Sequence, residues 1–360
     1  MNVDGVPWRT IWPAANGRDV EVIDQTLLPH ALKVETLRGL DDAVRAIATM
    51  VVRGAPLIGA TAGWGMALAM QDDASDAHLA AAGAALVAAR PTAVNLAWAV
   101  ARQTAVLTPL PPSERVRAAR AEAAAIVEED VAWCAAIGRH GAAALKAHAR
   151  ADRPLQILTH CNAGWLAAVD HGTALSPVYA LHDAGVPVHV WVDETRPRNQ
   201  GASLTAWELA RHGLPHTLIA DNAGGHLMRI GRIDACIVGS DRVAANGDVC
   251  NKIGTYLKAL AAADCGVPFY AALPASTIDF ELASGDLIPI EERDAGELLT
   301  MTGRDSDGVV RTVAIAPHDT PGANFAFDVT PARLVTAIIT ERGVCAASAA
   351  GLAGLYGRTA

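Results

Sequence analysis

The sequence predicts an α/β protein in which a mainly helical part is followed by a parallel sheet. From residue 155 onward, short apolar runs that fit buried strands alternate with polar loops and helical segments. This alternation is typical of a parallel sheet with right-handed crossovers. Before residue 126, helical segments dominate and the strands are short. We therefore expect a small mixed, mainly helical domain over residues 1–126 and a Rossmann-like parallel-sheet domain over residues 127–360.

The composition fits a globular chain and argues against two classes of partner. The chain has 360 residues, 51% of them hydrophobic and 4% aromatic, so it can bury a large core in two domains. Its net charge is −9 and it has no dense stripe of Lys and Arg, whereas nucleic-acid binding needs a basic face. No apolar run reaches membrane-spanning length. We expect neither nucleic acid nor a membrane as a partner.

The cysteines, histidines and glycines indicate a cytoplasmic protein without a metal or cofactor. Six cysteines are spread along the chain, none in a C-x-x-C pair, and the amino terminus does not resemble a signal peptide. A reducing cytoplasm fits this pattern best. The twelve histidines show no metal-ligand spacing such as H-E-x-x-H, and no G-x-G-x-x-G follows a predicted strand. The usual metal and dinucleotide sites are therefore not expected.

In the N-terminal part, two breaks between predicted helices bring an arginine to a position where it could meet a ligand. Residues 1–40 are expected to form short strands and turns, and a helix over residues 41–52 ends at Arg53-Gly-Ala-Pro. A glycine next to a proline at such a break lets the backbone approach a ligand closely. Arg90 precedes a further helix that begins with Pro91. The alternative for both arginines is an exposed position at an ordinary helix–helix turn.

A proline-rich run over residues 108–112 separates these helices from a longer helical stretch. Three prolines in four residues cannot continue a helix. Ser113 can cap a helix that ends near residue 127, and a second helix is expected over residues 128–148. The expected domain boundary near residue 126 rests on this arrangement.

Four strands of the predicted sheet lead into polar loops. The strands are expected over residues 156–159, 186–192, 217–220 and 235–238, with further candidates at 268–272 and 313–315. In a parallel sheet these loops leave the same edge, where α/β proteins bind their ligands. Cys161, Gln200 and Asp241 are therefore expected to lie close together.

The stretch after the fourth strand is expected to hold the reactive centre. Residues 239–247 fit a loop and residues 248–263 fit a helix. Asp241 would then lie at the strand tip, with Asn251 and Lys252 in the first helical turn, where free N–H groups and the helix dipole favour an anion. These residues predict a small anionic substrate. The alternative is that Asp241 is only a turn residue and Lys252 a solvated lysine.

Several motifs carry a resemblance to a known enzyme family. They are Arg53-Gly-Ala-Pro, Cys161-Asn-Ala-Gly, Asp193-Glu-Thr-Arg-Pro with Gln200-Gly, and Gly239-Ser-Asp-Arg with Asn251-Lys-Ile-Gly-Thr-Tyr. Together they closely resemble the S-methyl-5-thioribose-1-phosphate isomerase family, and the likeness runs over nearly the whole chain. The same superfamily contains ribose-1,5-bisphosphate isomerases and the regulatory α, β and δ subunits of the eukaryotic translation-initiation guanine-nucleotide exchange factor.

The resemblance implies a homodimer that performs a metal-free aldose–ketose isomerisation of a sugar phosphate in methionine salvage. In that family the Cys of the C-N-A-G motif and the Asp of the G-A-D-R motif are catalytic, which implies these roles for Cys161 and Asp241. The substrate contacts implied in the same way are Arg53, Gly54, Ala55, Arg90, Gln200, Asn251 and Lys252. Two positions depart from the family pattern, because Ser240 replaces the usual Ala and Ser203 stands where Arg is common.

The chemistry of such a reaction explains the two catalytic residue types. A sugar whose C1 hydroxyl is esterified with phosphate cannot open freely to an aldehyde, so the enzyme must help to break the ring bond and then move hydrogen from C2 to C1. Asp241, kept protonated by an apolar pocket, can give its proton to the ring oxygen. Cys161 can act as the base of an enolate route or as a polarising neighbour in a hydride-shift route. Both routes stay open.

Other functions are compatible with the same fold. The site could act on ribose 1,5-bisphosphate, which needs a second cluster of cations or N–H donors at C5. It could also act on 5-deoxyribose 1-phosphate, which needs an apolar pocket there, as the methylthio sugar does. A non-catalytic regulatory subunit would have no use for the pair of Cys161 and Asp241.

Overall fold

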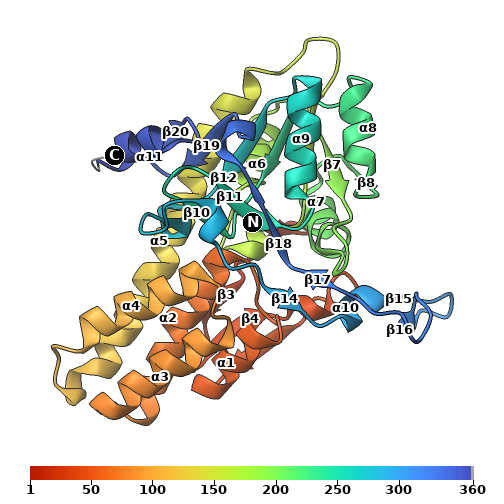
Figure 1. The fold of residues 1–360 in the computed structure, drawn as a ribbon. Coiled ribbons are helices and arrows are strands. Elements are labelled where there is room, and N and C mark those ends of the chain that lie inside the picture. Colours follow the sequence, from red (N-terminus) through yellow and green to blue (C-terminus); the bar gives the residue numbers. More distant parts are fainter. Residues whose placement is uncertain (358–360) are drawn as a thin grey trace.

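The computed structural model describes residues 1–357 and has a helical lower part and a sheet-containing upper part (Figure 1). The lower part opens with a three-stranded antiparallel sheet of β3, β4 and β5. Four helices follow, and α2 packs against its three neighbours and against α5. The bounds are β3 Ile11–Pro13, β4 Val20–Ile23, β5 Val34–Leu37, α1 Leu40–Ala48, α2 Ala55–Asp72, α3 Asp76–Ala89 and α4 Val94–Leu107.

Helix α2 forms the centre of this lower part. Its residues from Leu57 to Met70 are all buried, which is the pattern of a helix surrounded by other elements. Small residues allow this: a Cβ at Gly65 would lie 2.9 Å from Leu86 on α3, and one at Gly59 would lie 3.0 Å from the carbonyl oxygen of Asn95. The close packing fixes the N-terminus of α2, which points toward the sheet.

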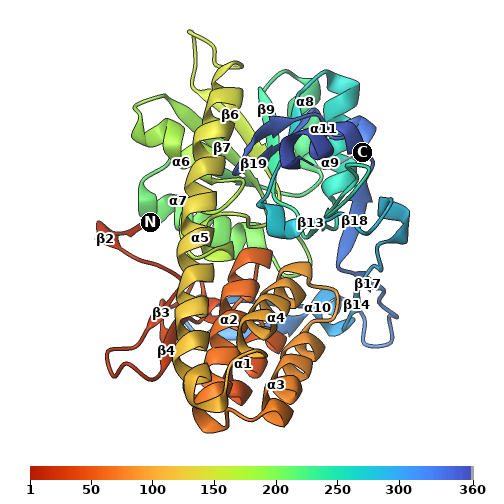
Figure 2. The same ribbon diagram turned by 90° about the vertical axis from the view of Figure 1, so that its left-hand side faces the viewer.

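A single helix, α5 (Pro112–Lys146), connects the two parts and runs along most of the molecule (Figure 2). The prediction of two helices was wrong here, because no glycine or proline interrupts the segment around residue 127. Its first half contributes Ile126 to the lower core, and its second half contributes Ile137 to the core under the sheet. The domain boundary near residue 126 falls inside this helix and stays a prediction.

The upper part is built on a seven-stranded sheet with the order β20-β19-β12-β9-β6-β7-β8. All neighbouring strands are parallel except the edge pair of β19 and β20. The strands are β6 Leu155–Thr159, β7 Val188–Asp193, β8 His216–Ile219, β9 Ala235–Val238, β12 Phe269–Ala272, β19 Ala337–Thr340 and β20 Gly343–Cys345. The predicted fold class is confirmed.

Both faces of the sheet are covered by helices. Alternate residues of each strand face opposite cores, as a period of two requires: Ile237 packs on the side of α5 and α6, and Cys236 packs on the side of α8 and α9. The covering helices are α6 Ser176–Asp183, α7 Ala206–His212, α8 Ala223–Arg229, α9 Thr255–Cys265 and α11 Ala349–Tyr356. No helix within residues 1–357 is long and apolar enough to cross a membrane.

The strand order reverses between β6 and β9. From β6 the chain builds β7 and β8 on one side, and from β9 it builds β12 and β19 on the other. The carboxyl ends of two such neighbouring strands leave a crevice between their loops, which is where open α/β sheets bind ligands. Cys161 follows β6 and Asp241 follows β9, so both lie at this crevice.

A second, four-stranded sheet corrects the prediction of a helix over residues 248–263. Residues Val249–Lys252 form β11, which pairs with β10 (Arg242–Ala244) across a turn at Gly247 and with β18 (Phe327–Thr330) on its other side. Gly254 adopts φ +101, so the helix can begin only at Thr255. Val243 and Val249 pair across this hairpin, and the distant strand β18 pairs with the other edge of β11, a long-range contact that helix propensity could not reveal.

The remaining strands are short and lie outside the parallel sheet. The candidate strand at residues 313–315 was placed wrongly, because β16 (Val310–Ala314) pairs only with β15 (Thr300–Arg304) in a hairpin that projects from the molecule (Figure 1). The other elements are β1 Asn2–Val3, β2 Val6–Pro7, β13 Ile278–Asp279, β14 Glu292–Arg293, α10 Gly296–Leu299 and β17 Asn324–Phe325.

Candidate active site

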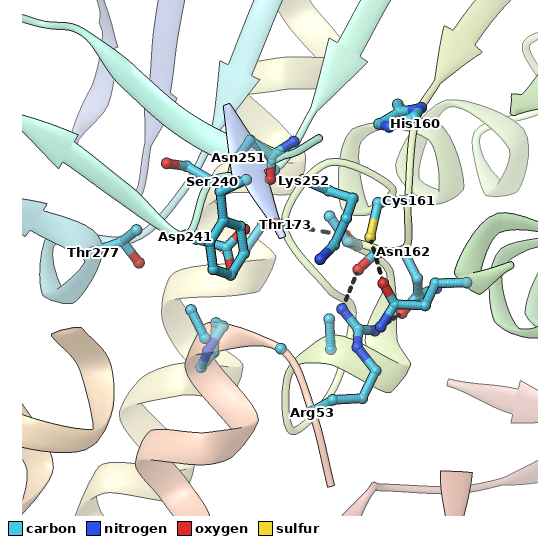
Figure 3. Close-up of a pocket in the computed structure, with 18 of the residues that line it drawn as sticks. Arg53, His160, Cys161, Asn162, Thr173, Ser240, Asp241, Asn251, Lys252 and Thr277 are labelled. Carbon is cyan, nitrogen blue, oxygen red and sulfur yellow. Dashed lines mark hydrogen bonds between the residues drawn. The ribbon is translucent and has the colours of Figure 1, made fainter. Parts of the chain in front are cut away.

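The predicted site residues all line one pocket at the crevice between β6 and β9 (Figure 3). The lower part supplies the segment around Arg53 and Arg90, and the upper part supplies the loops after β6, β7 and β9. The predicted residues in the pocket wall are Arg53, Gly54, Ala55, Arg90, Cys161, Gln200, Asp241, Asn251 and Lys252. Sequence reasoning did not assign Met50, His160, Asn162, Thr173, Thr277 and Phe327, which line it too.

Cys161 is held in an unusual backbone conformation at the tip of β6. Its φ is +66, in the left-handed region that a non-glycine residue adopts only when its surroundings enforce it. The N–H donates to Thr195 Oγ1 at 2.8 Å, and the carbonyl accepts from Thr205 Oγ1 at 2.7 Å. The thiol donates to Gln200 Oε1 at 3.2 Å. The sulfur therefore faces the pocket in one orientation.

The charge on Cys161 depends on two opposing effects. Burial raises the pKa of the thiol, while the positive charges of Arg53 and Lys252 lower it. The thiol form is thus favoured in the free enzyme, and the two cations would stabilise a thiolate that forms during turnover.

Arg53 both charges the pocket and holds the loop that follows Cys161. Its Nη1 donates to Asn162 Oδ1 at 2.6 Å and its Nη2 donates to the Asn162 carbonyl at 2.8 Å. Burial lowers the pKa of Arg53, and Cys161 and Asp241 oppose that shift. The side chain is buried, so the alternative of an exposed arginine is wrong.

The N-terminus of α2 opens onto the pocket through Ala55 and Pro56. Gly54 has φ +90, and a Cβ there would lie 2.4 Å from the Ala167 carbonyl oxygen, so only glycine fits. The N–H groups of the first helical turn have no helical carbonyl partner and attract an anion. Arg90 lines the same pocket, and its buried Nε has no hydrogen-bond partner among the described residues.

Asp241 is a half-buried acid surrounded by cations. Burial raises its pKa, and Lys252, Arg90 and Arg53 oppose the shift. Its N–H donates to the Cys250 carbonyl at 2.9 Å, which fixes the loop against β11. A carboxyl group whose pKa is raised can be protonated and act as a general acid near neutral pH.

The two serines that depart from the family pattern have local roles in this structure. The Ser240 hydroxyl lies 3.0 Å from the carbonyl oxygens of Arg242 and Cys250 and donates within that loop. Ser203 lies on a π-helical turn over Gly201–Thr205 and donates its N–H to the Asn199 carbonyl at 2.7 Å.

Lys252 lies on strand β11, not at a helix N-terminus as predicted. Its Nζ donates to the Ala326 carbonyl at 2.9 Å and lies 4.6 Å from the centre of the Phe327 ring. Burial lowers the pKa of Lys252, while Cys161 and Asp241 raise it. Cys161 and Asp241 thus both influence the Lys252 ammonium, and the helix whose first turn lines the pocket is α2 instead of α9.

A larger cavity adjoins the polar pocket. The pocket around Cys161 and Asp241 encloses about 50 Å³, whereas the adjoining cavity encloses about 520 Å³. Met50, Arg53 and Gln200 line both. Much of the cavity wall is apolar and comes from Leu27, Leu28, Pro29, Pro197, Leu204 and Met301. A ligand with a polar and an apolar end could fill both spaces.

One group of side chains near the pocket has the composition of a metal site. The ligand atoms of His160, Asp193 and Asp221 lie within 4.8 Å of one another. However, the Nζ atom of Lys258 lies 3.2 Å from Asp193 Oδ2. A buried ammonium at this place supplies the positive charge that a cation would bring, so these residues fit a metal poorly.

Comparisons with known proteins identify the family of this chain. Residues 51–347 match the model of the Initiation factor 2 subunit family. The methylthioribose-1-phosphate isomerase of Methylorubrum extorquens is 65% identical over 99% of this chain and 98% of that protein. The protein of the same name from Paramagnetospirillum magneticum is 62% identical over 99% of each chain.

Two solved structures show the same fold. The 5-methylthioribose 1-phosphate isomerase from Pyrococcus horikoshii has a TM-score of 0.84 and 43% identity, and the match covers 98% of this chain and 96% of that one. The translation initiation factor eIF-2B subunit delta from A. fulgidus has a TM-score of 0.80 and 37% identity, with 97% and 99% coverage. The chain thus belongs to the Initiation factor 2 subunit family and, within it, to the methylthioribose-1-phosphate isomerases.

Proposed function

We propose that this protein isomerises S-methyl-5-thio-α-D-ribose 1-phosphate to S-methyl-5-thio-D-ribulose 1-phosphate, a step of methionine salvage. The observation that carries the proposal is the pair of a buried thiol and a half-buried carboxyl group, Cys161 and Asp241, facing one pocket with three cations. The phosphate would lie at the N-terminus of α2 between Arg90 and Lys252, with Arg53, Gly54 and Ala55 near it. Gln200 and Asn251 would orient the sugar hydroxyl groups.

The reaction can be written from these groups. Asp241 gives its proton to the ring oxygen, the bond from that oxygen to C1 breaks, and positive charge develops at C1 beside the phosphate ester. In the enolate route, the Cys161 thiol first releases its proton to water, and the thiolate then takes the proton from C2 to form an enol phosphate. The same proton returns from the thiol to C1 as the O2 proton leaves, which gives the ketone. In the hydride route, hydrogen moves from C2 to C1 with its electron pair and O2 loses its proton. Both routes give the C2 ketone without an added oxidant.

The adjoining cavity supports a methylthio group at C5. Its apolar wall can bury such a group, at about 0.8 kcal/mol per CH₂ equivalent. A second phosphate would need free cations there, but Arg198 is paired with Glu297 at 2.6 Å and Arg304 donates to the His30 carbonyl at 3.0 Å. The cavity thus favours the methylthio sugar over ribose 1,5-bisphosphate, and 5-deoxyribose 1-phosphate would leave part of it empty.

An assay of the purified protein with the three sugar phosphates tests this proposal. We expect the highest kcat/KM for the methylthio sugar. Met301→Lys, which places a charge in the cavity wall, should lower that value by about tenfold or more, since an apolar contact in a pocket contributes about 1–3 kcal/mol to discrimination. Ile315→Lys adds the same charge to an exposed residue outside the cavity and should have little effect.

Other results of this assay would point elsewhere. A preference for the bisphosphate would contradict the assignment of the cavity. Turnover of none of the three sugars would favour a non-catalytic role, as in the regulatory subunits of the superfamily.

We also propose that the protein works as a homodimer in the cytoplasm. The six cysteines are free thiols, which suits a reducing compartment. The segment from Leu334 to Leu355 forms the edge of the sheet and α11, and Val344 there is exposed. Closed two-fold dimers are the commonest assembly. Sedimentation at micromolar concentration should give a dimer, and a monomer alone would overturn this part of the proposal.

A further inference from the structure

His160 is buried directly before Cys161, and both of its ring nitrogens face acceptors. The side chain is 1% exposed. Its Nδ1 lies 2.8 Å from Asp193 Oδ2, and its Nε2 lies 2.8 Å from the Ile253 carbonyl oxygen. A neutral imidazole carries one N–H and could donate to only one of them. The Lys258 ammonium, 3.2 Å from the same Asp193 oxygen, favours the ionised carboxylate. With Asp193 ionised, both contacts are hydrogen bonds only when the ring is a cationic imidazolium.

The surrounding charges compensate such a cation. Asp193, at the end of β7, is fully buried and also meets Lys258 of α9 at 3.2 Å. Asp221, after β8, has an oxygen 3.9 Å from His160 Nδ1. Asp328 of β18 lies nearby and accepts from the N–H groups of Gly254 and Tyr256. Two cations and three carboxyl groups thus form one cluster, in which His160, Asp193 and Lys258 are buried, and buried charges persist only when they are paired.

The ring connects the two halves of the pocket. Its own residue is next to Cys161, and its acceptor Ile253 is next to Lys252. Gly254 completes the contact: a Cβ there would lie 3.1 Å from His160 Cε1 and Nε2. The imidazole therefore packs on the backbone of the turn that follows β11 and joins it to the tips of β6 and β7.

We propose that His160 is a positioning residue for the reaction, an imidazolium that holds Cys161 at a fixed separation from Lys252 through its hydrogen bonds to Asp193 and Ile253. A displacement of about 1 Å between reacting groups can cost about 10²-fold in rate. The inference rests on the proposed function only in that Cys161 is the reacting thiol. The protonation of the ring can be tested without any substrate.

The first test is nitrogen NMR of the full-length protein labelled with ¹⁵N-histidine at neutral pH. His160 can be assigned through its contact with Gly254. We expect both ring nitrogens to show the shift and proton coupling of N–H groups. One unprotonated nitrogen would overturn the proposal even if the protein is an active isomerase.

The second test is the kinetic behaviour of His160→Gln and Asp193→Asn. His160→Gln removes the imidazolium, and Asp193→Asn removes its carboxylate partner, while the phosphate contacts stay. We therefore expect kcat to fall about 10- to 100-fold in each variant, with a much smaller change in KM. The matched control is His189→Gln, since His189 lies on β7 outside the cluster and bonds to Thr217. Wild-type kcat in folded His160→Gln or folded Asp193→Asn would overturn the proposal. If His160→Gln does not fold, Asp193→Asn and the NMR result decide.

Discussion

Replacing Asp241 with asparagine should lower kcat by about 10²-fold or more, the scale of lost general-acid assistance. The amide keeps the shape of the side chain but has no proton to give to the ring oxygen. The phosphate is held by other groups, so KM should change far less than kcat, as for an interaction made mostly in the transition state. Steady-state kinetics with circular dichroism as a folding control would measure both. Near-normal turnover in a folded variant would contradict the general-acid role and leave Asp241 as a turn residue.

Although Asp241→Asn should lower activity, we expect it to raise the stability of the folded protein at neutral pH. Burial raises the pKa of Asp241 in the folded protein, whereas the pKa of an aspartate in an unfolded chain is about 3.9. The unfolded state therefore releases its proton first, and the contribution of this group to stability declines as pH rises from the unfolded pKa through the folded pKa. Asparagine does not ionise, so Asp241→Asn should unfold at a higher temperature than the wild type at neutral pH, and the difference should shrink toward acid pH.

Replacing Cys161 with serine should lower kcat by a similar factor, about 10²-fold or more. Serine can keep the backbone contacts to Thr195 and Thr205, so the loop should stay folded. It loses the soft sulfur that Arg53 and Lys252 could stabilise as a thiolate. Binding of the sugar phosphate, measured by calorimetry, should survive.

Cys345→Ser is the matched control for this experiment. Cys345 is half-buried on the edge strand β20 and lies outside the pocket. It should retain wild-type kcat. A Cys161→Ser enzyme as active as this control would show that the thiol takes no part in the chemistry.

Much of the fold could be predicted because the signals for it are local. Apolar runs such as Ala235–Val238 are short and bounded by polar turns, so the buried strands were recognisable. The convergence of Cys161, Gln200 and Asp241 followed from one rule, that parallel strands end at one edge. It was confirmed by the shared pocket.

The errors arose where a distant partner decides the local structure. Residues 249–252 form a strand because β18 pairs with them from a distant part of the sequence: Cys250 pairs with Val329, 79 positions away, and Asn251 pairs with Asp328, 77 positions away. No local sequence window covers such a separation. The helix N-terminus at the pocket is consequently that of α2 and not that of α9, although Lys252 itself lies in the pocket as predicted.

The side chains that support the site were missed for a related reason. Asn162 stands in the C-N-A-G motif, but its role as the acceptor of Arg53 depends on a contact across 109 positions. Glu208 of α7 accepts a hydrogen bond from the N–H of Leu166, a few residues after Asn162, and burial raises the pKa of Glu208 to about 7. Only the packed structure shows that these polar groups meet.

The central claim is that one sugar phosphate lies between Cys161 and Asp241, and a crystal structure of Asp241→Asn with the methylthio sugar phosphate tests it most directly. The slow variant should retain the substrate during the experiment. We expect the phosphate at the N-terminus of α2, the methylthio group in the adjoining cavity, and C2 about 3 to 3.5 Å from the Cys161 sulfur, the separation of a near-attack geometry. A sugar bound with its C1 and C2 atoms away from both residues would contradict the account.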